Sequence, residues 1–225
     1  EQLPCVFDVS ARTVATQALN IFGDHSDVYA CRQTGFAMLA ESNPQEVMDL
    51  SPVAHLAAIE GKVPFINFFD GFRTSHEISK IEKWDYADLK EMCNMKAVEK
   101  FREHALNPEH PAMRGSHENG DVFFQHREAC NSVYDELPAV VEKYMKKVND
   151  KLGTNYDLFN YYGAEDADRV IIAMGSVCDV AEEVIDYLDA MGQKVGLVKV
   201  RLYRPWSPKA LLKVLPKSVK KIAVL

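Results

Sequence analysis

The sequence lacks an apolar run of the ~20 residues that a membrane-spanning helix needs, and it has no excess of basic residues. Lys and Arg total 26 against 33 Asp and Glu, which gives a formal net charge of −7. Nucleic acids and anionic membranes both attract proteins with a basic face. The composition therefore argues against nucleic acid or a membrane surface as the main partner.

The sequence also lacks the common cysteine and glycine motifs. Its five cysteines, at positions 5, 31, 93, 130 and 178, are scattered, and none forms the C-x-x-C pattern of zinc or iron–sulfur sites. An odd count does not suggest a disulfide framework, so we expect reduced thiols in an intracellular setting. Positions 173–178 read AMGSVC and lack a G-x-G-x-x-G fingerprint, which leaves a dinucleotide site only weakly indicated.

The chain is long enough for a substantial core, in one large domain or two small ones. It has 225 residues, of which 47% are hydrophobic and 26% charged, as is usual for a globular protein. It begins with Glu1 instead of Met, and residues 221–225 read as a strand that stops abruptly. We therefore expect a fragment of a longer chain.

Short apolar runs alternate with helical patterns along the sequence, which predicts an α/β fold with mainly parallel sheets. A change of pattern after Asn155 predicts a boundary between residues 1–155 and 156–225. Residues 107–120 show no periodicity and are expected to pack on another domain. The predicted strands span residues 5–9, 36–40, 63–69, 169–174, 194–200 and 221–225. The predicted helices span residues 13–22, 44–61, 85–104, 137–152 and 180–191, with a short one after Ser207.

Arg12 is the leading candidate for a binding residue. It follows the first predicted strand and precedes the helix predicted over 13–22, which Gly23 would end. Ligands of open α/β sheets bind at that edge, and a helix N-terminus favours an anion. The guanidinium matches a carboxylate bidentately. The alternative is that Arg12 pairs with Asp8 or Asp24, or lies on a solvated surface.

Three other groups of polar residues invite a functional interpretation, and a structural one is favoured for each. Asp24, His25 and Asp27 resemble a hard-metal site but fit a turn and cap network better. Arg73, His76 and Glu77 follow a strand and either contact a ligand or cap the next segment. His55 has no second ligand at helical spacing, so we expect a packed or hydrogen-bonded side chain. Residues 203–206 are interpreted as an interface turn.

Several long stretches resemble pyruvate:ferredoxin (flavodoxin) oxidoreductases, the thiamine-diphosphate enzymes that oxidise 2-oxoacids. The stretches are DVSARTVATQALNIFGDHSDVYACRQTGFAMLA (residues 8–40), NFFDGFRTSHEISKIE (67–82), ALNPEHPAMRG (105–115) and VGLVKVRLYRPW (195–206). The resemblance implies two three-layer domains, both truncated: a pyrimidine-binding-like domain over 1–155 and a transketolase-C-terminal-like domain over 156–225. Arg12 matches the family arginine that binds the substrate carboxylate, and it is the one site residue, catalytic and substrate-binding, that the resemblance assigns here.

The resemblance also implies a reaction and its partners. The complete enzyme would convert pyruvate to acetyl-CoA and CO₂ with thiamine diphosphate, Mg²⁺, [4Fe-4S] clusters and coenzyme A, passing electrons to ferredoxin or flavodoxin. The ligands of those cofactors would lie outside this segment, which would be inactive alone. A homodimer in the cytoplasm is implied, or in a hydrogenosome if the source is eukaryotic. The alternatives are a related enzyme for another 2-oxoacid and a non-catalytic α/β ligand-binding protein.

Overall fold

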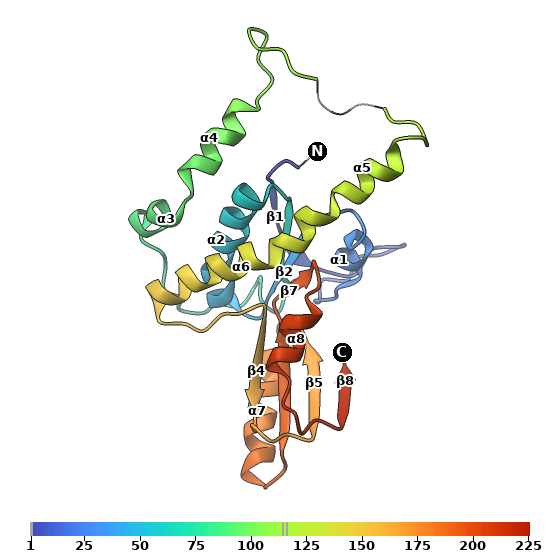
Figure 1. The fold of residues 1–225 in the computed structure, drawn as a ribbon. Coiled ribbons are helices and arrows are strands. Elements are labelled where there is room, and N and C mark those ends of the chain that lie inside the picture. Colours follow the sequence, from blue (N-terminus) through green and yellow to red (C-terminus); the bar gives the residue numbers. More distant parts are fainter. Residues whose placement is uncertain (1, 114, 116) are drawn as a thin grey trace.

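A computed structural model of the chain, describing residues 2–113, 115 and 117–225, contains two four-stranded sheets (Figure 1). The first sheet has the strand order β1-β3-β2-β7 and the second the order β4-β6-β5-β8. Each sheet carries one antiparallel strand at an edge, β7 and β4 respectively, beside parallel neighbours. The predicted α/β class with mainly parallel sheets is therefore confirmed.

The first sheet is built from β1 (Val6–Ala11), β3 (Phe65–Asp70), β2 (Ala37–Glu41) and the short β7 (Leu202–Arg204). Its central strands β2 and β3 are almost wholly buried, as expected for continuous apolar strands in a parallel sheet. Ala11 pairs with Asp70 at the carboxyl ends of β1 and β3. Those ends therefore bring the residues that follow them together.

Helix α2 (Pro44–Gly61) packs on the first sheet, and α6 (Asn131–Leu152) packs on α2. The start of α2 is fixed locally: the Asn43 side chain accepts the Glu46 backbone N–H at 3.0 Å, and Pro44 occupies the first turn. The Glu46 carboxylate in turn accepts the Ser42 backbone N–H at 2.8 Å. The helix predicted over residues 44–61 is thus confirmed, and it continues through Pro52. Glu46 reaches the N–H of Ser42, the residue before the cap Asn43.

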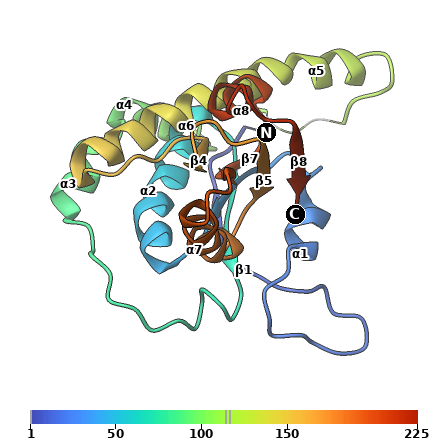
Figure 2. The same cartoon turned by 90° about the horizontal axis from the view of Figure 1, so that it is seen from below.

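The second sheet contains β4 (Phe159–Gly163), β6 (Val195–Val200), β5 (Arg169–Ala173) and β8 (Lys221–Val224). Helices α7 (Val177–Ala190) and α8 (Pro208–Val214) lie on its opposite sides (Figure 2). The Ser207 side chain caps α8 by accepting the Ala210 backbone N–H. The predicted strands over 169–174, 194–200 and 221–225 are confirmed, as is the helix over 180–191, which begins three residues earlier than predicted.

A buried ion pair connects helix α2, which packs on the first sheet, to the residue that follows β6 of the second sheet. The Arg201 guanidinium, which follows β6, binds both carboxylate oxygens of Glu46 at 2.7 and 2.9 Å. It also donates to Asn160 Oδ1 at 2.6 Å. Lys199 Nζ lies 3.8 Å from Glu46 and 2.8 Å from Glu182 of α7. Because β7 belongs to the first sheet, residues on both sides of position 155 contribute to one sheet.

The helix predicted over residues 13–22 is wrong. These residues form an exposed loop that returns to the sheet, where Arg12 and Gly23 make an antiparallel bridge. The apolar residues of the loop have no core to pack against, and Leu19 is 89% exposed. The first helix is instead α1 (Ser26–Cys31). Arg12 therefore does not stand at a helix N-terminus, and that part of the argument for an anion site falls away.

Other element boundaries differ from the prediction. The helix predicted over 85–104 is two helices, α3 (Tyr86–Met92) and α4 (Met95–Glu103), because the Asn94 side chain caps a new helix. The helix predicted from residue 137 begins at 131 and follows the unpredicted α5 (Phe123–Ala129). Strands β4 and β7 were also missed, and β7 contains part of the predicted interface turn. Within the described residues, we find no helix long and apolar enough to span a bilayer.

Candidate functional site

The carboxyl ends of β1, β3 and β5 converge at Asp70. Arg12 follows β1, Asp70 ends β3, and Gly175 and Ser176 follow β5. Ser176 donates to Asp70 from its backbone N–H at 2.7 Å and from its hydroxyl at 2.5 Å. The parallel sheets thus place polar groups from distant parts of the chain at one edge, where ligands bind in open α/β folds.

The Arg12 side chain makes two hydrogen bonds and has no ion-pair partner among the described residues. Its Nε donates to the Ile21 carbonyl at 3.0 Å and its Nη2 to Ser75 Oγ at 3.3 Å. None of the ion pairs among the described residues includes Arg12. The predicted alternative, a pair with Asp8 or Asp24, is therefore not formed. A half-buried guanidinium with unused donors is suited to bind an anion.

The turn over residues 71–76 shapes the space beside Arg12. Gly71 is required there, because a Cβ at this position would overlap the Arg12 side chain and lie 2.8 Å from the Ala11 carbonyl. Phe72 has a φ of +61°, a strained conformation for a residue with a side chain. Its ring packs edge-on against Phe22 at 5.0 Å, which connects the turn to the 13–22 loop.

The buried Asp70 carboxylate connects the end of β3 to His25 and to Ser176. His25 Nε2 lies 2.7 Å from Asp70 Oδ1, and both Ser176 donors reach Oδ2. Burial alone would raise the pKa of the Asp70 carboxyl, but the hydrogen bonds from His25 and Ser176 outweigh it and hold the pKa below its usual value. The group is therefore a structural carboxylate at neutral pH and has little remaining capacity for a ligand.

The other carboxylates of this edge are also engaged. Asp24 accepts the Ser26 backbone N–H at 2.6 Å, and Asp27 accepts the backbone N–H groups of Val28 and Arg12 at 2.6 and 2.9 Å. The hydrogen bonds to Ser26 lower the pKa of Asp24. Among the described residues there is no group of three or more His, Cys, Asp or Glu that could hold a metal ion. The acidic turn forms a network of hydrogen bonds to backbone N–H groups, in line with the turn network that the sequence favoured, although the N-cap residue His25 makes no side-chain cap hydrogen bond.

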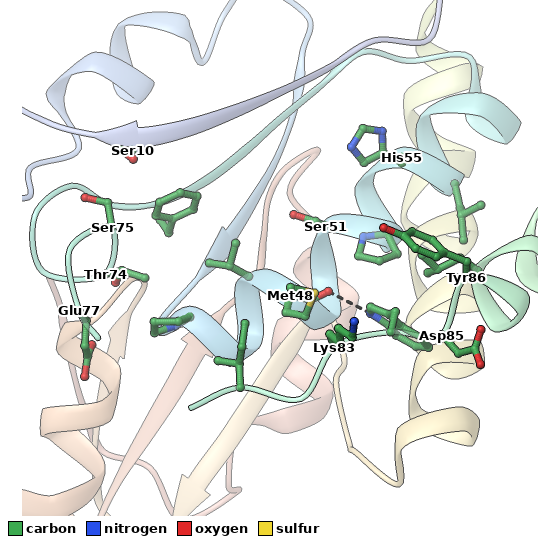
Figure 3. A pocket seen from close by; sticks show the side chains of 18 residues that line it. Ser10, Met48, Ser51, His55, Thr74, Ser75, Glu77, Lys83, Asp85 and Tyr86 are labelled. Carbon is green, nitrogen blue, oxygen red and sulfur yellow. Dashed lines mark hydrogen bonds between the residues drawn. The ribbon is translucent and has the colours of Figure 1, made fainter. Parts of the chain in front are cut away.

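The polar residues after β3 have separate positions. Arg73 and Glu77 are exposed, and His76 Nδ1 lies 2.8 Å from Ser75 Oγ. Glu77 and His55 stand at opposite ends of a groove of about 1170 Å³ that runs along α2 (Figure 3). His55 is exposed there and makes no side-chain hydrogen bond within the described part of the chain, so the prediction of a packed or hydrogen-bonded side chain is wrong. Ser75 also lines the groove, which links it to the Arg12 site.

Sequence reasoning identified Arg12 but missed Ser75, which contacts it, and the Asp70–Ser176 contact at the same edge. The strand predicted over 63–69 ends before Asp70 and the helix predicted over 180–191 begins after Ser176, so the sequence assigns neither residue a role. The sequence feature that could have identified Asp70 as part of the site is its place at the carboxyl end of a buried strand. Nothing in the sequence pairs it with Ser176, which is 106 positions away.

The chain matches two sequence families over most of its length. Residues 1–146 match the family described as "Pyruvate flavodoxin/ferredoxin oxidoreductase, thiamine diP-bdg". Residues 167–225 match "Pyruvate:ferredoxin oxidoreductase core domain II". The Arg12 site lies in the first match, and Ser176 lies in the second.

Curated relatives resemble the whole chain. It is 60% identical over 225 residues to a pyruvate-flavodoxin oxidoreductase of Enterobacter agglomerans and 56% identical over 225 residues to a pyruvate:ferredoxin oxidoreductase of Moorella thermoacetica. Each alignment covers 100% of this chain and 19% of the relative. The chain thus spans about a fifth of the length of the relatives it matches.

A solved structure shares the fold. It is a 2-oxoglutarate:ferredoxin oxidoreductase from Magnetococcus marinus with 2-oxoglutarate, coenzyme A and succinyl-CoA bound. The TM-score is 0.61 at 20% sequence identity, with 99% of this chain and 41% of that chain covered. At this identity the likeness concerns the arrangement of the elements.

Proposed function

Since the chain belongs to the pyruvate flavodoxin/ferredoxin oxidoreductase family, we propose that it is part of an enzyme that oxidatively decarboxylates pyruvate to acetyl-CoA and CO₂. In this proposal Arg12 binds the carboxylate of the 2-oxoacid. The observation that carries the proposal is the Arg12 guanidinium itself, half-buried at the carboxyl end of β1 and without an ion-pair partner among the described residues. Sequence identity of 60% over the whole chain to a pyruvate-flavodoxin oxidoreductase supports it.

The chemistry expected of Arg12 is positioning. A guanidinium presents two parallel N–H donors to a carboxylate, which fixes the orientation of the 2-oxoacid. The carboxylate leaves as CO₂, so its charge is lost from the substrate during the reaction. An ion pair that is stronger in the ground state than in the transition state would slow that step. Because Arg12 Nε donates to the Ile21 carbonyl and one Nη2–H to Ser75 Oγ, Nη1 and the second Nη2–H remain to bind the carboxylate.

The described residues do not by themselves fit a diphosphate–Mg²⁺ site. The carboxylates near Arg12 are committed to internal hydrogen bonds, and the described part of the chain contains no metal-ligand cluster. As the sequence resemblance implies, we propose that the ligands of thiamine diphosphate, Mg²⁺, the [4Fe-4S] clusters and coenzyme A lie in other parts of the longer protein. When bound, thiamine diphosphate supplies the carbanion chemistry and the clusters carry the electrons.

The remaining features of the proposal concern organisation. The chain would comprise the end of a pyrimidine-binding-like domain (1–155) and the start of a transketolase-C-terminal-like domain (156–225). The family matches to residues 1–146 and 167–225 support this division. Electrons would pass to ferredoxin or flavodoxin, and the enzyme would be a homodimer in the cytoplasm. The names of the curated relatives support the acceptor.

Steady-state kinetics of the full-length protein test the proposal. Replacing Arg12 by Ala should raise the KM for pyruvate at least tenfold, because a hydrogen-bonded charge pair is worth about 1.5–3 kcal/mol. Thiamine diphosphate and iron contents should stay near those of the unchanged protein. Arg12→Lys should recover only part of the affinity, since an ammonium cannot bind a carboxylate bidentately. An unchanged KM in Arg12→Ala would remove the proposed role.

A further inference from the structure

The hydroxyl of Ser75 has three neighbours, and they determine where its proton lies. Ser75 Oγ accepts the Phe72 backbone N–H at 2.8 Å and an Arg12 Nη2–H at 3.3 Å. A serine oxygen has two acceptor positions and one O–H donor. Both acceptor positions are therefore occupied, and the O–H is left to donate to the third neighbour, His76 Nδ1, at 2.8 Å. In this arrangement His76 Nδ1 is the acceptor.

This arrangement strengthens the contact with Arg12. A hydroxyl that donates its own proton becomes a better acceptor, because hydrogen bonds in a chain polarise one another. The Arg12 guanidinium is thereby held at two of its nitrogens. The Ile21 carbonyl of the 13–22 loop binds Nε, and Ser75 of the 71–76 turn binds Nη2. Two fixed points define the plane of the guanidinium and the direction of its free N–H groups.

The backbone at Gly71 and Phe72 supports the contact between Ser75 and Arg12. Phe72 adopts its left-handed φ of +61° where the chain turns back, and its N–H is what anchors Ser75. Strain of this kind persists where the local structure is over-determined, and it clusters at ligand sites. Gly71 provides the room that the Arg12 side chain occupies. These features concern residues that the proposed function leaves without a role.

We infer that Ser75 and His76 are a positioning pair: Ser75 orients the Arg12 guanidinium toward a carboxylate ligand, and His76 fixes the Ser75 proton. The inference rests on the proposed role of Arg12, and it adds two residues that act through Arg12. Its consequence is that affinity for a carboxylate substrate depends on an acceptor at the position of His76 Nδ1. Affinity is affected, while the chemical step is not.

Kinetics of the full-length enzyme with pyruvate separate the pair from a purely structural role. Ser75→Ala should raise KM about three- to tenfold and leave kcat within twofold, since it removes one exposed hydrogen bond to a charged group. Ser75→Thr keeps the hydroxyl and should restore most of the affinity. His76→Leu should raise KM in the same direction by a smaller factor. His76→Asn places an oxygen near the Nδ1 position and should retain more affinity than His76→Leu.

Arg73→Ala is the matched control, because Arg73 lies in the same turn, is exposed, and makes no side-chain hydrogen bond within the described ranges 2–113, 115 and 117–225. Its KM should be unchanged. In the double variant Arg12→Ala/Ser75→Ala, KM should stay within twofold of Arg12→Ala alone, because Ser75 acts through Arg12.

The outcomes distinguish the inference from the proposal on which it rests. If Arg12→Ala raises KM while Ser75→Ala does not, the positioning pair is overturned and the role of Arg12 stands. If the two effects multiply in the double variant, Ser75 does not act through Arg12 and the inference is again overturned. A loss of kcat with a lower unfolding temperature in Ser75→Ala would show a structural role instead. If Arg12→Ala leaves KM unchanged, the proposed role itself fails.

Discussion

The Asp70 carboxylate binds Ser176 twice, through the backbone N–H at 2.7 Å and the hydroxyl at 2.5 Å. Asp70 ends β3 of the first sheet, and Ser176 precedes α7 of the second. The same carboxylate lies within hydrogen-bond distance of His25. Asp27, two residues after His25, accepts the Arg12 backbone N–H at 2.9 Å. The packing of one sheet against the other is thereby coupled to the loop that carries Arg12.

Gly175 should be intolerant of a side chain at this junction. Its φ is +81°, and a Cβ would lie 2.7 Å from Asp70 Oδ1. Gly175→Ala should therefore destabilise the protein by about 2–4 kcal/mol, which combines a left-handed backbone penalty of about 1–2 kcal/mol with the displacement of a buried carboxylate. Thermal unfolding of the protein would measure this as a lower midpoint.

Gly192 offers a matched control for backbone strain. It has a similar φ of +78°, but no heavy atom lies within 4 Å of the position of its Cβ. Gly192→Ala should therefore cost only the backbone penalty of about 1–2 kcal/mol. Equal losses in the two variants would show that the contact with Asp70 adds nothing beyond the glycine conformation.

Local signals predicted the elements whose ends are fixed by neighbouring residues. Asn43 and Pro44 start α2, and Ser207 and Pro208 start α8, because a side-chain cap and a proline act within one turn. The buried strand over 65–70 followed from its continuous apolar run. These features require no knowledge of the rest of the chain.

Long-range pairing explains what could not be predicted. Val14, Leu19 and Ile21 recur at roughly helical spacing in the 13–22 segment, yet all three are exposed. Periodicity stabilises a helix only where a core receives its apolar face. Strand β7 has three residues and exists through its pairing with β2, more than 160 positions earlier. Arg12 was identified by its place after a strand, while its contact with Ser75 depends on how the strands are ordered.

Breaking the buried ion pair between Glu46 and Arg201 should be costly. Both side chains are less than 10% exposed. Burial would raise the pKa of Glu46, but the hydrogen bonds and charge of Arg201 outweigh it and lower the pKa to about 2. Arg201→Met leaves that carboxylate buried with Lys199, at 3.8 Å, as its only cationic partner among the described residues, and should cost about 3–5 kcal/mol. Chemical denaturation would show the loss as a lower midpoint.

Two further variants test whether the loss in Arg201→Met comes from the unpaired Glu46 charge. Glu46→Gln/Arg201→Met removes the stranded charge and keeps an oxygen for the Ser42 backbone N–H, so it should recover part of the loss. The ion pair of Lys194 with Asp166 is exposed, and Lys194→Met should leave the midpoint unchanged. A double variant less stable than Arg201→Met alone would contradict the stranded-charge explanation.

Glu41 should make the protein less stable as pH rises. It ends β2, is 0% exposed, and neither carboxyl oxygen has a hydrogen-bond partner among the described residues. Burial raises the pKa of this carboxyl well above 4.5, with smaller contributions from the charges of Glu46 and Asp8, against the opposing effect of Arg201. A raised pKa in the folded state favours the protonated form, so stability is greatest below the ordinary pKa and falls as pH rises above it. Glu41→Gln has no proton to lose, and its advantage in unfolding midpoint over the unchanged protein should grow from pH 4 to pH 8.

Glu60 is the control for Glu41, because its pKa is shifted in the opposite direction. Burial would raise its pKa, but hydrogen bonds from Lys143, Tyr144 and Asn94 outweigh this and lower the pKa to about 2. A depressed pKa contributes stability above the ordinary value of 4.5, and that stability is lost as pH falls toward 2. Glu60→Gln should therefore be destabilising at pH 7, with a difference that shrinks as the solution is acidified. If Glu41→Gln followed the same trend as Glu60→Gln, the Glu41 carboxyl would be ionised in the folded protein and a partner for it would have to exist.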